Sequence, residues 1–303
     1  MTPFIFFDVP YKLLRKSLPK GAYVLGRKLF GRLEQFCSPE HAMMIVALYQ
    51  EHIPIEGKVI LEIGPGNDIS TAIMMVMMGA ERVYLVDKIS KLTEKGHSND
   101  IEFTKAFLLE IKKAGIVVEG MKDIPPQEIA DKISFIDSYF TDSDRLFEAL
   151  GEVKQVDCIV SHQVLEHIDN PDEAFKNMRT MLKPGGVMFH EIDFSDHTMH
   201  IFSKYPILRR LCRNHSLAHL YYSDKFWKVC NDTVRLNMNR HVLPDYLALF
   251  ERYGFIVSGL SRQKTGCKQD IHHDILSRIE DEKLKTDDYL QLSSVSIQVN
   301  GLF

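Results

Sequence analysis

Residues 59–79 contain a strand, a glycine turn and a helix in immediate succession, and few folds accommodate that order. The run VILEI at 59–63 predicts a buried strand, positions 64–66 are Gly-Pro-Gly, and residues 70–79 are apolar on almost every side. A strand and a helix that are both buried throughout are typical of parallel α/β sheets. The glycines let the backbone approach a ligand closely, and the free N–H groups of the helix favour an anionic or polar ligand group.

The rest of the chain continues the alternation of strands and helices, which predicts parallel βαβ units. Further strands are predicted at 82–87, 132–137, 156–161, 187–193 and 255–260, with a final edge strand at 293–302. Helices are predicted at 99–114, 171–182 and 244–253, and an earlier helix begins at Ser38-Pro39-Glu40 and runs to Gln50. The double proline at 125–126 predicts an irregular connection over 116–131.

An acidic residue at the end of the second predicted strand indicates the kind of ligand. Asp87 follows Gly66 by 21 residues, close to the offset at which an acid binds the two hydroxyls of a ribose. The dinucleotide pattern requires a third glycine where this chain has Ile69. Glu62 and Asp68 flank the turn and would repel a pyrophosphate, whereas an ammonium and a sulfonium would suit them. These residues favour S-adenosylmethionine over NAD.

Three segments resemble motifs of the class I (Rossmann-like) S-adenosylmethionine-dependent methyltransferases. They are EIGPG at 62–66, DCIVSHQVLEHI at 157–168 and MLKPGG at 181–186, which resemble the first motif, the fourth-strand motif and the turn before the fifth strand. Together they cover residues 57–193 in the family's order. One departure is Asp68, which stands where the family often has a third glycine.

The resemblance implies an α/β fold with a seven-stranded, mostly parallel Rossmann-like sheet, and S-adenosyl-L-methionine as cofactor and methyl donor. The residues at the ends of the first and fourth strands would line the methionine and sulfonium. Asp87 would bind the ribose, Lys88 would lie beside the adenine, and the residues after the third strand would meet the edge of the adenine. The implied cofactor-binding residues are Glu62, Gly64, Pro65, Gly66, Asp87, Lys88, Asp137, Ser138, Ser161, His162 and Gln163.

Methyl transfer needs a general base only when the acceptor is a hydroxyl or a protonated amine. Open α/β sheets place their sites beyond the carboxyl ends of the strands, which selects His162, His167, Asp193, Asp196 and His197. His197 is the first candidate for a base or acceptor-binding residue, because neighbouring Asp193 and Asp196 could orient it. His167 is the second, and its alternative is a structural, helix-capping role. We expect no metal site, because no Cys/His cluster or HExxH pattern is present, and a divalent ion that serves an acceptor diol stays an open alternative.

We expect four segments: an N-terminal helical cap at 1–56, the cofactor-binding core at 57–193, a helical insertion at 194–243 that forms an acceptor lid, and the end of the core at 244–303. Residues 1–33 carry seven basic side chains and one acidic one, interleaved with apolar residues. This stretch could cap the cofactor pocket or contact an anionic membrane surface, and we favour the cap. The arginines of the insertion could bind an anionic acceptor or simply be solvated.

Composition excludes several other classes of protein. The chain has 37 basic and 41 acidic side chains and a net charge of −4, so we expect no nucleic-acid partner. Its five cysteines are scattered, and we find neither a signal peptide nor an apolar run long enough to span a membrane. We therefore expect a cytoplasmic protein, and the sequence leaves its oligomeric state open.

The sequence thus predicts a methyltransferase, and we favour an oxygen of a small or medium-sized acceptor as the methylated atom. The stretch after residue 193 is also similar to methyltransferases of sugar and polysaccharide pathways. Two alternatives stay open: an interaction module that binds S-adenosylmethionine without turnover, and an NAD-dependent sugar oxidoreductase, against which Ile69 argues.

Overall fold

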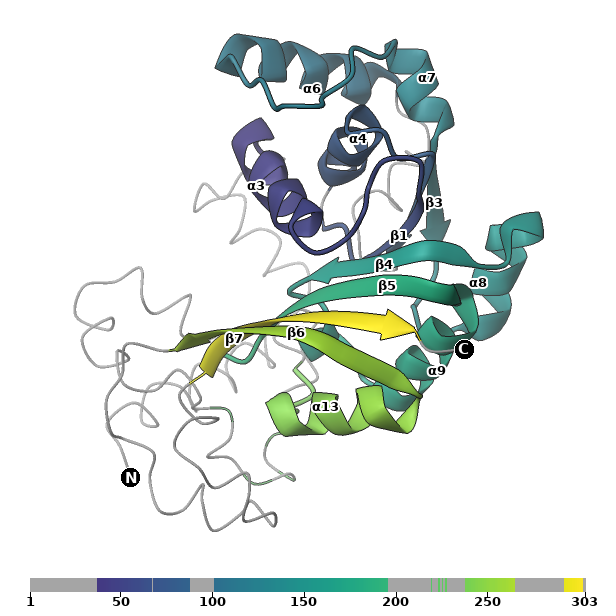
Figure 1. Cartoon of the computed structure of the whole chain (residues 1–303), viewed down its shortest axis with the longest axis vertical. Helices are drawn as coiled ribbons and strands as arrows, with labels where there is room; N and C mark the ends of the chain where they lie inside the picture. Colours follow the sequence, from purple (N-terminus) through teal and green to yellow (C-terminus); the bar gives the residue numbers. More distant parts are fainter. Residues whose placement is uncertain are drawn as a thin grey trace, which may run out of the picture.

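The computed structural model describes residues 37–66, 68–87, 101–195, 238–264 and 292–301, together with residues 219, 223, 225 and 227. In this part of the chain, seven strands form one sheet with helices on both faces (Figure 1). The predicted cap residues 1–36, most of the predicted insertion, and residues 265–291 lie outside the described residues, so the division into four segments stays a prediction.

The sheet has the strand order β3-β2-β1-β4-β5-β7-β6. The strands are β1 (Val59–Ile63), β2 (Arg82–Asp87), β3 (Ile133–Asp137), β4 (Val156–His162), β5 (Leu182–Asp193), β6 (Phe255–Lys264) and β7 (Leu292–Gly301). Strands β1 to β5 pair in parallel, whereas β7 is antiparallel to both β5 and β6. The predicted seven-stranded, mostly parallel sheet is confirmed.

The expectation that the last strand forms an edge is wrong, because β7 lies between β5 and β6. Within β7, Ile297 and Val299 are fully buried and belong to the core on one face of the sheet, while Asn300 is exposed. An alternating pattern reports that one face of a strand is covered. It carries no information on whether both of its backbone edges are paired.

Helices cover the two faces of the sheet in separate groups (Figure 1). One face carries α3 (Pro39–Gln50), α4 (Ser70–Met77), α6 (Ile101–Ala114) and α7 (Pro126–Asp131). The other carries α8 (Ser143–Leu150), α9 (Pro171–Met181) and α13 (Leu243–Arg252). All eight residues of α4 are buried, as expected for the apolar helix after the glycine turn.

Helix starts follow local capping chemistry. Ser38 accepts a hydrogen bond from the backbone N–H of His41 at 3.3 Å, and Pro39 occupies the first turn of α3, as predicted. The irregular connection predicted for 116–131 is wrong at its end, because Pro126 begins α7. A proline in the first helical turn costs no hydrogen bond, so the double proline starts a helix here.

Two further elements differ from the sequence analysis. Helix α8 has no counterpart in the predicted elements. Strand β5 begins at Leu182, five residues earlier than predicted, because Leu182 pairs with Val156 of β4 ahead of an irregularity in the ladder. The segment predicted as a turn, with Gly185 at a φ of 72°, therefore lies inside the strand.

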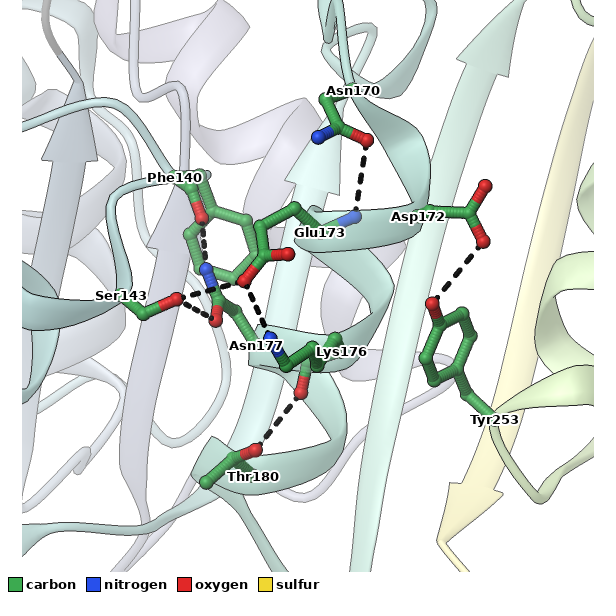
Figure 2. A network of polar contacts seen from close by, with 9 residues as sticks. All are labelled: Phe140, Ser143, Asn170, Asp172, Glu173, Lys176, Asn177, Thr180 and Tyr253. Atoms are coloured by element: carbon green, nitrogen blue, oxygen red, sulfur yellow. Dashed lines mark hydrogen bonds and ion pairs between the residues drawn. The ribbon is translucent and has the colours of Figure 1, made fainter.

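A polar network ties α9 to its neighbours (Figure 2). The buried side chain of Asn177 donates to the carbonyl oxygen of Phe140 at 2.8 Å and accepts from the Ser143 hydroxyl at 2.7 Å. At the other end of α9, Asp172 accepts a hydrogen bond from the Tyr253 hydroxyl at 3.2 Å. These contacts join the start of α8 and the end of α13 to α9.

Candidate active site

The carboxyl ends of the central strands lie side by side at one edge of the sheet. Asp87 at the end of β2 pairs in register with Asp137 at the end of β3. On the other side of β1, His162 at the end of β4 pairs in register with Glu191 of β5. Ligands of open α/β sheets bind at this edge, so we describe the site from β1 outward.

The turn after β1 needs glycine for two different reasons. Gly64 has a φ of 66°, and a Cβ atom there would lie 2.6 Å from Cγ2 of Val164, so packing excludes any side chain. Gly66 has a φ of 85°, but a Cβ atom there would meet no described atom within 4 Å. Among the described residues, the backbone around Gly66 therefore borders open space, while Pro65 is partly buried between the two glycines.

Glu62 is the last acid of β1, and only 3% of its surface is exposed. The Tyr49 hydroxyl donates to its Oε1 at 3.2 Å, and the Thr71 hydroxyl donates to its Oε2 at 2.7 Å. Burial raises the pKa of Glu62 to about 7, against the opposing effects of these two hydrogen bonds and of nearby His162. The carboxyl group is thus poised to change charge near neutral pH, and a cationic ligand would favour its ionised form.

Asp68, the departure from the family's glycine pattern, has a structural role. Its Oδ1 accepts from the backbone N–H of Ser70 at 2.9 Å, at the start of α4, and its Oδ2 accepts from that of Cys37 at 2.7 Å. Burial, with added repulsion from Asp68 and Glu62, raises the pKa of the Cys37 thiol to about 12. Cys37 is therefore an unreactive thiol rather than a nucleophile.

His162 and Glu191 form a pair on the same face of the sheet as Glu62. The Nε2 atom of His162 lies 3.2 Å from Oε2 of Glu191, and the two side chains are 17% and 12% exposed. Register places Glu62 beside Val160, and side chains alternate along β4, so His162 shares that face. The next residue, Gln163, has a φ of 57° and donates its backbone N–H to the Glu191 carbonyl oxygen at 2.8 Å.

The second predicted base, His167, lies beside Glu166. Its Nε2 lies 3.9 Å from Oε1 of Glu166 in the short helix η2 (Leu165–His167). Burial, followed by repulsion from Asp193, raises the pKa of Glu166 well above its usual range. Burial therefore favours the neutral form of the Glu166 carboxyl group. The predicted Asp193 is almost buried, and its Oδ1 accepts from the backbone N–H of Ser195 at 2.7 Å.

Two predicted cofactor residues use their side chains elsewhere. Ser161 is buried and contacts Nδ1 of His190 at 2.8 Å, on the face of the sheet opposite to Glu62. Burial lowers the pKa of His190 to about 3, so this pair stays neutral. Ser138 is buried and its hydroxyl donates to the carbonyl oxygen of Tyr139 at 3.2 Å.

The structure thus brings Glu62, the glycine turn and His162 together and places Asp87 and Asp137 at the neighbouring strand ends, where Asp137 is exposed. The predicted Lys88, Asp196 and His197 lie outside the described residues. Within the described part of the chain, no group of three or more His, Cys, Asp or Glu side chains could hold a metal ion. Nor, in the same part, is any helix long and apolar enough to cross a membrane.

Three side chains of this site were missed by the sequence analysis: Tyr49, Thr71 and Glu191. Glu191 had a signal, because an acid near the end of the fifth predicted strand should meet residues at the end of the fourth. No sequence signal marked Tyr49 or Thr71 as a site residue, because each lies in a helical segment that is predicted to be buried among apolar residues.

A sheet of this order, with a glycine turn after β1 and an acid at the end of β2, places the protein in the class of Rossmann-like α/β proteins. Sequence comparison then gives the family: the model described as "Methyltransferase domain" matches residues 38–257. The chain belongs to this family of S-adenosylmethionine-dependent methyltransferases, and S-adenosylmethionine is its methyl donor. No curated protein matches the sequence significantly.

Many solved structures are similar in fold. Geranyl diphosphate C-methyltransferase from Streptomyces coelicolor A3(2) is 11% identical with a TM-score of 0.48, and the match covers 91% of this chain and 87% of that one. Phosphoethanolamine N-methyltransferase 2 from Haemonchus contortus is 15% identical with a TM-score of 0.48, covering 91% and 56%. An S-adenosylmethionine-dependent methyltransferase from Mesorhizobium loti is 11% identical with a TM-score of 0.45, covering 87% and 98%.

Proposed function

We propose that this protein transfers the methyl group of S-adenosylmethionine to a hydroxyl oxygen of a small or medium-sized acceptor. The observation that carries the proposal is the His162–Glu191 pair at the carboxyl ends of β4 and β5, on the face of Glu62. A hydroxyl must lose its proton as it is methylated, and a histidine oriented by a carboxylate is suited to take it.

The residues at the strand ends fit the cofactor chemically. The buried carboxylate of Glu62 would hold the ammonium group, the open space beside Gly66 would admit the methionine portion, and Asp87 would bind the ribose hydroxyls. When bound, the cofactor supplies an electrophilic methyl group on a sulfonium. The chain therefore has to orient the acceptor and exclude water, and such positioning is worth about 7–11 kcal/mol in favourable cases.

In this proposal His162 is the general base. Because its Nε2 faces Glu191, Nδ1 is the atom that would receive the proton of the acceptor hydroxyl, and Glu191 would stabilise the imidazolium that forms. His162 thereby takes precedence over His167, because its Nε2 lies 3.2 Å from Glu191, whereas Nε2 of His167 lies 3.9 Å from Glu166. His197, with Asp193, stays a prediction from the sequence alone.

The first test is the methylated atom. Purified protein would be incubated with labelled S-adenosylmethionine and a panel of hydroxyl, amine and carbon acceptors. The panel would begin with sugars and with anionic small molecules, the latter because residues 194–243 contain several arginines. We expect transfer to a hydroxyl. Transfer to carbon or to an amine alone would contradict the proposal, and cofactor binding with no transfer to any acceptor would favour the non-catalytic interaction module.

The second test is the base. His162→Gln should lower kcat at saturating S-adenosylmethionine by about 100-fold or more. The matched variant His167→Gln should leave kcat almost unchanged. If the two variants behave in the reverse way, His162 is not the base.

A further inference from the structure

We propose that Tyr49 is a positioning residue, which acts with Thr71 to hold the Glu62 carboxylate ionised and oriented for the ammonium group of the cofactor. The inference rests on the proposed contact between Glu62 and that ammonium. It adds a residue of α3, before the first strand, to the cofactor site.

The geometry places one donor on each carboxylate oxygen from a different helix. Tyr49 is fully buried in the last turn of α3, with its ring edge against Phe189 at a centroid distance of 6.0 Å. Its hydroxyl reaches Oε1 of Glu62 at 3.2 Å, while Thr71 of α4 reaches Oε2 at 2.7 Å. Each carboxylate oxygen can accept a further hydrogen bond. The carboxylate can therefore accept from the hydroxyls of Tyr49 and Thr71 and still bind a cation.

The two hydroxyls matter because burial works against the charge. Burial raises the pKa of Glu62 to about 7, and the hydrogen bonds from Thr71 and Tyr49 oppose this rise. Among the described residues, the other titratable groups that act on the carboxylate are Asp68, which raises its pKa, and His162, which lowers it. Cys37 also faces Glu62, but its own pKa of about 12 keeps it neutral.

Loss of either hydroxyl should therefore make the ionised carboxylate harder to form. Only the ionised form pairs with an ammonium, so the affinity for the cofactor should fall as Glu62 becomes protonated. Hydrogen bonds to a charged group are stronger than those to a neutral one. We expect removal of the Tyr49 hydroxyl to move the pH at which affinity falls upward by about one pH unit.

The experiment is calorimetric titration of the full chain with S-adenosylhomocysteine, which keeps the ammonium group, from pH 5.5 to 8.5. We expect binding to wild type to weaken below about pH 7. A shift of one pH unit in Tyr49→Phe should lower the affinity about fivefold at pH 7 and about tenfold at pH 6. Glu62→Gln should bind weakly at every pH. Tyr84→Phe is the matched control, because this buried tyrosine lies on the other face of the sheet, and its profile should overlay that of wild type.

A second pair of variants covers the case in which Tyr49→Phe does not fold. Thr71→Val should shift the profile upward, whereas Thr71→Ser, which keeps a hydroxyl, should restore it. Imidazole groups change charge in the same pH range, so His162→Gln is titrated alongside to separate its contribution.

Each outcome decides the matter. A Tyr49→Phe profile that overlays wild type, or Thr71→Val and Thr71→Ser profiles that coincide, would overturn the inference. Wild-type affinity in Glu62→Gln would instead remove the premise that Glu62 holds the ammonium. Because no acceptor is present, failure of the proposed hydroxyl methylation would leave these results unchanged.

Discussion

Replacing Glu62 by glutamine should stabilise the cofactor-free protein at neutral and alkaline pH. The pKa of Glu62 is raised by burial from 4.5 to about 7 in the folded state, so the folded protein holds this proton more tightly than the unfolded chain. The resulting contribution to stability is fully present below pH 4.5 and is lost as the pH rises through about 7. The gap between the two pKa values corresponds to about 3 kcal/mol.

Glutamine is a close replacement, because the hydroxyls of Tyr49 and Thr71 can either donate or accept hydrogen bonds. At pH 8, the free energy of unfolding of Glu62→Gln should exceed that of wild type by about 3 kcal/mol, an upper estimate. At pH 5 the difference should fall below about 1 kcal/mol, because the wild-type carboxyl is then protonated in the folded state.

The assay is urea denaturation from pH 5 to 8.5, followed by the fluorescence of the chain's single tryptophan, Trp227, which is buried. Glu56→Gln is the control, since Glu56 is exposed and Lys122 holds its pKa below the usual value; it should show no gain at high pH. Saturating S-adenosylhomocysteine should reverse the order by stabilising wild type alone. A stability difference that does not change with pH would refute the reasoning.

Three other predictions concern the turn, the network and a thiol. Gly66→Ala should cost about 1–2 kcal/mol for its left-handed backbone and weaken S-adenosylhomocysteine binding, whereas Gly64→Ala should cost more because its Cβ would overlap Val164; equal losses of stability in denaturation would contradict this. Asn177→Ala should lower the free energy of unfolding by about 2 kcal/mol, because the buried carbonyl oxygen of Phe140 loses its donor and the partly buried Ser143 hydroxyl loses one of its two acceptors; an unchanged denaturation midpoint would argue against the network. Since burial raises its pKa to about 12, Cys37 should react with iodoacetamide at pH 8 about 100-fold more slowly than free cysteine. Peptide mass spectrometry would measure the labelling rate, and rapid labelling would show that the thiol is accessible and ionised.

The sequence predicts the elements around the first glycine turn closely. Strands β1 and β2 have the predicted bounds, and α3 begins at Ser38-Pro39 and ends at Gln50 as expected. These elements are marked by local chemistry: continuous apolar runs, a capping serine and glycines at the turns. Where the local signal was ambiguous, the prediction failed, as at Pro126, which starts α7 instead of interrupting an irregular segment.

The candidate site could be anticipated in part. Glu62, Gly64, Gly66 and Asp87 lie on or directly beside the first βαβ unit, and motif spacing was enough to select them. Ser161 shows the limit of that reasoning. It lies in the fourth-strand motif, but its side chain contacts His190 on the face of the sheet opposite to Glu62.

Turn glycines, helix caps and buried strands act over a few neighbouring residues, so the chain alone predicts the fold class and the cofactor and selects candidate residues for the cofactor loop. The interaction partners of the charged groups depend instead on tertiary packing. Glu191 meets His162, and Tyr49 meets Glu62, only because strands and helices distant along the chain pack together. Desolvation and hydrogen bonding depend on separations of a few ångströms, so the protonation of Glu62 and the pairing of His162 arise only in the packed molecule.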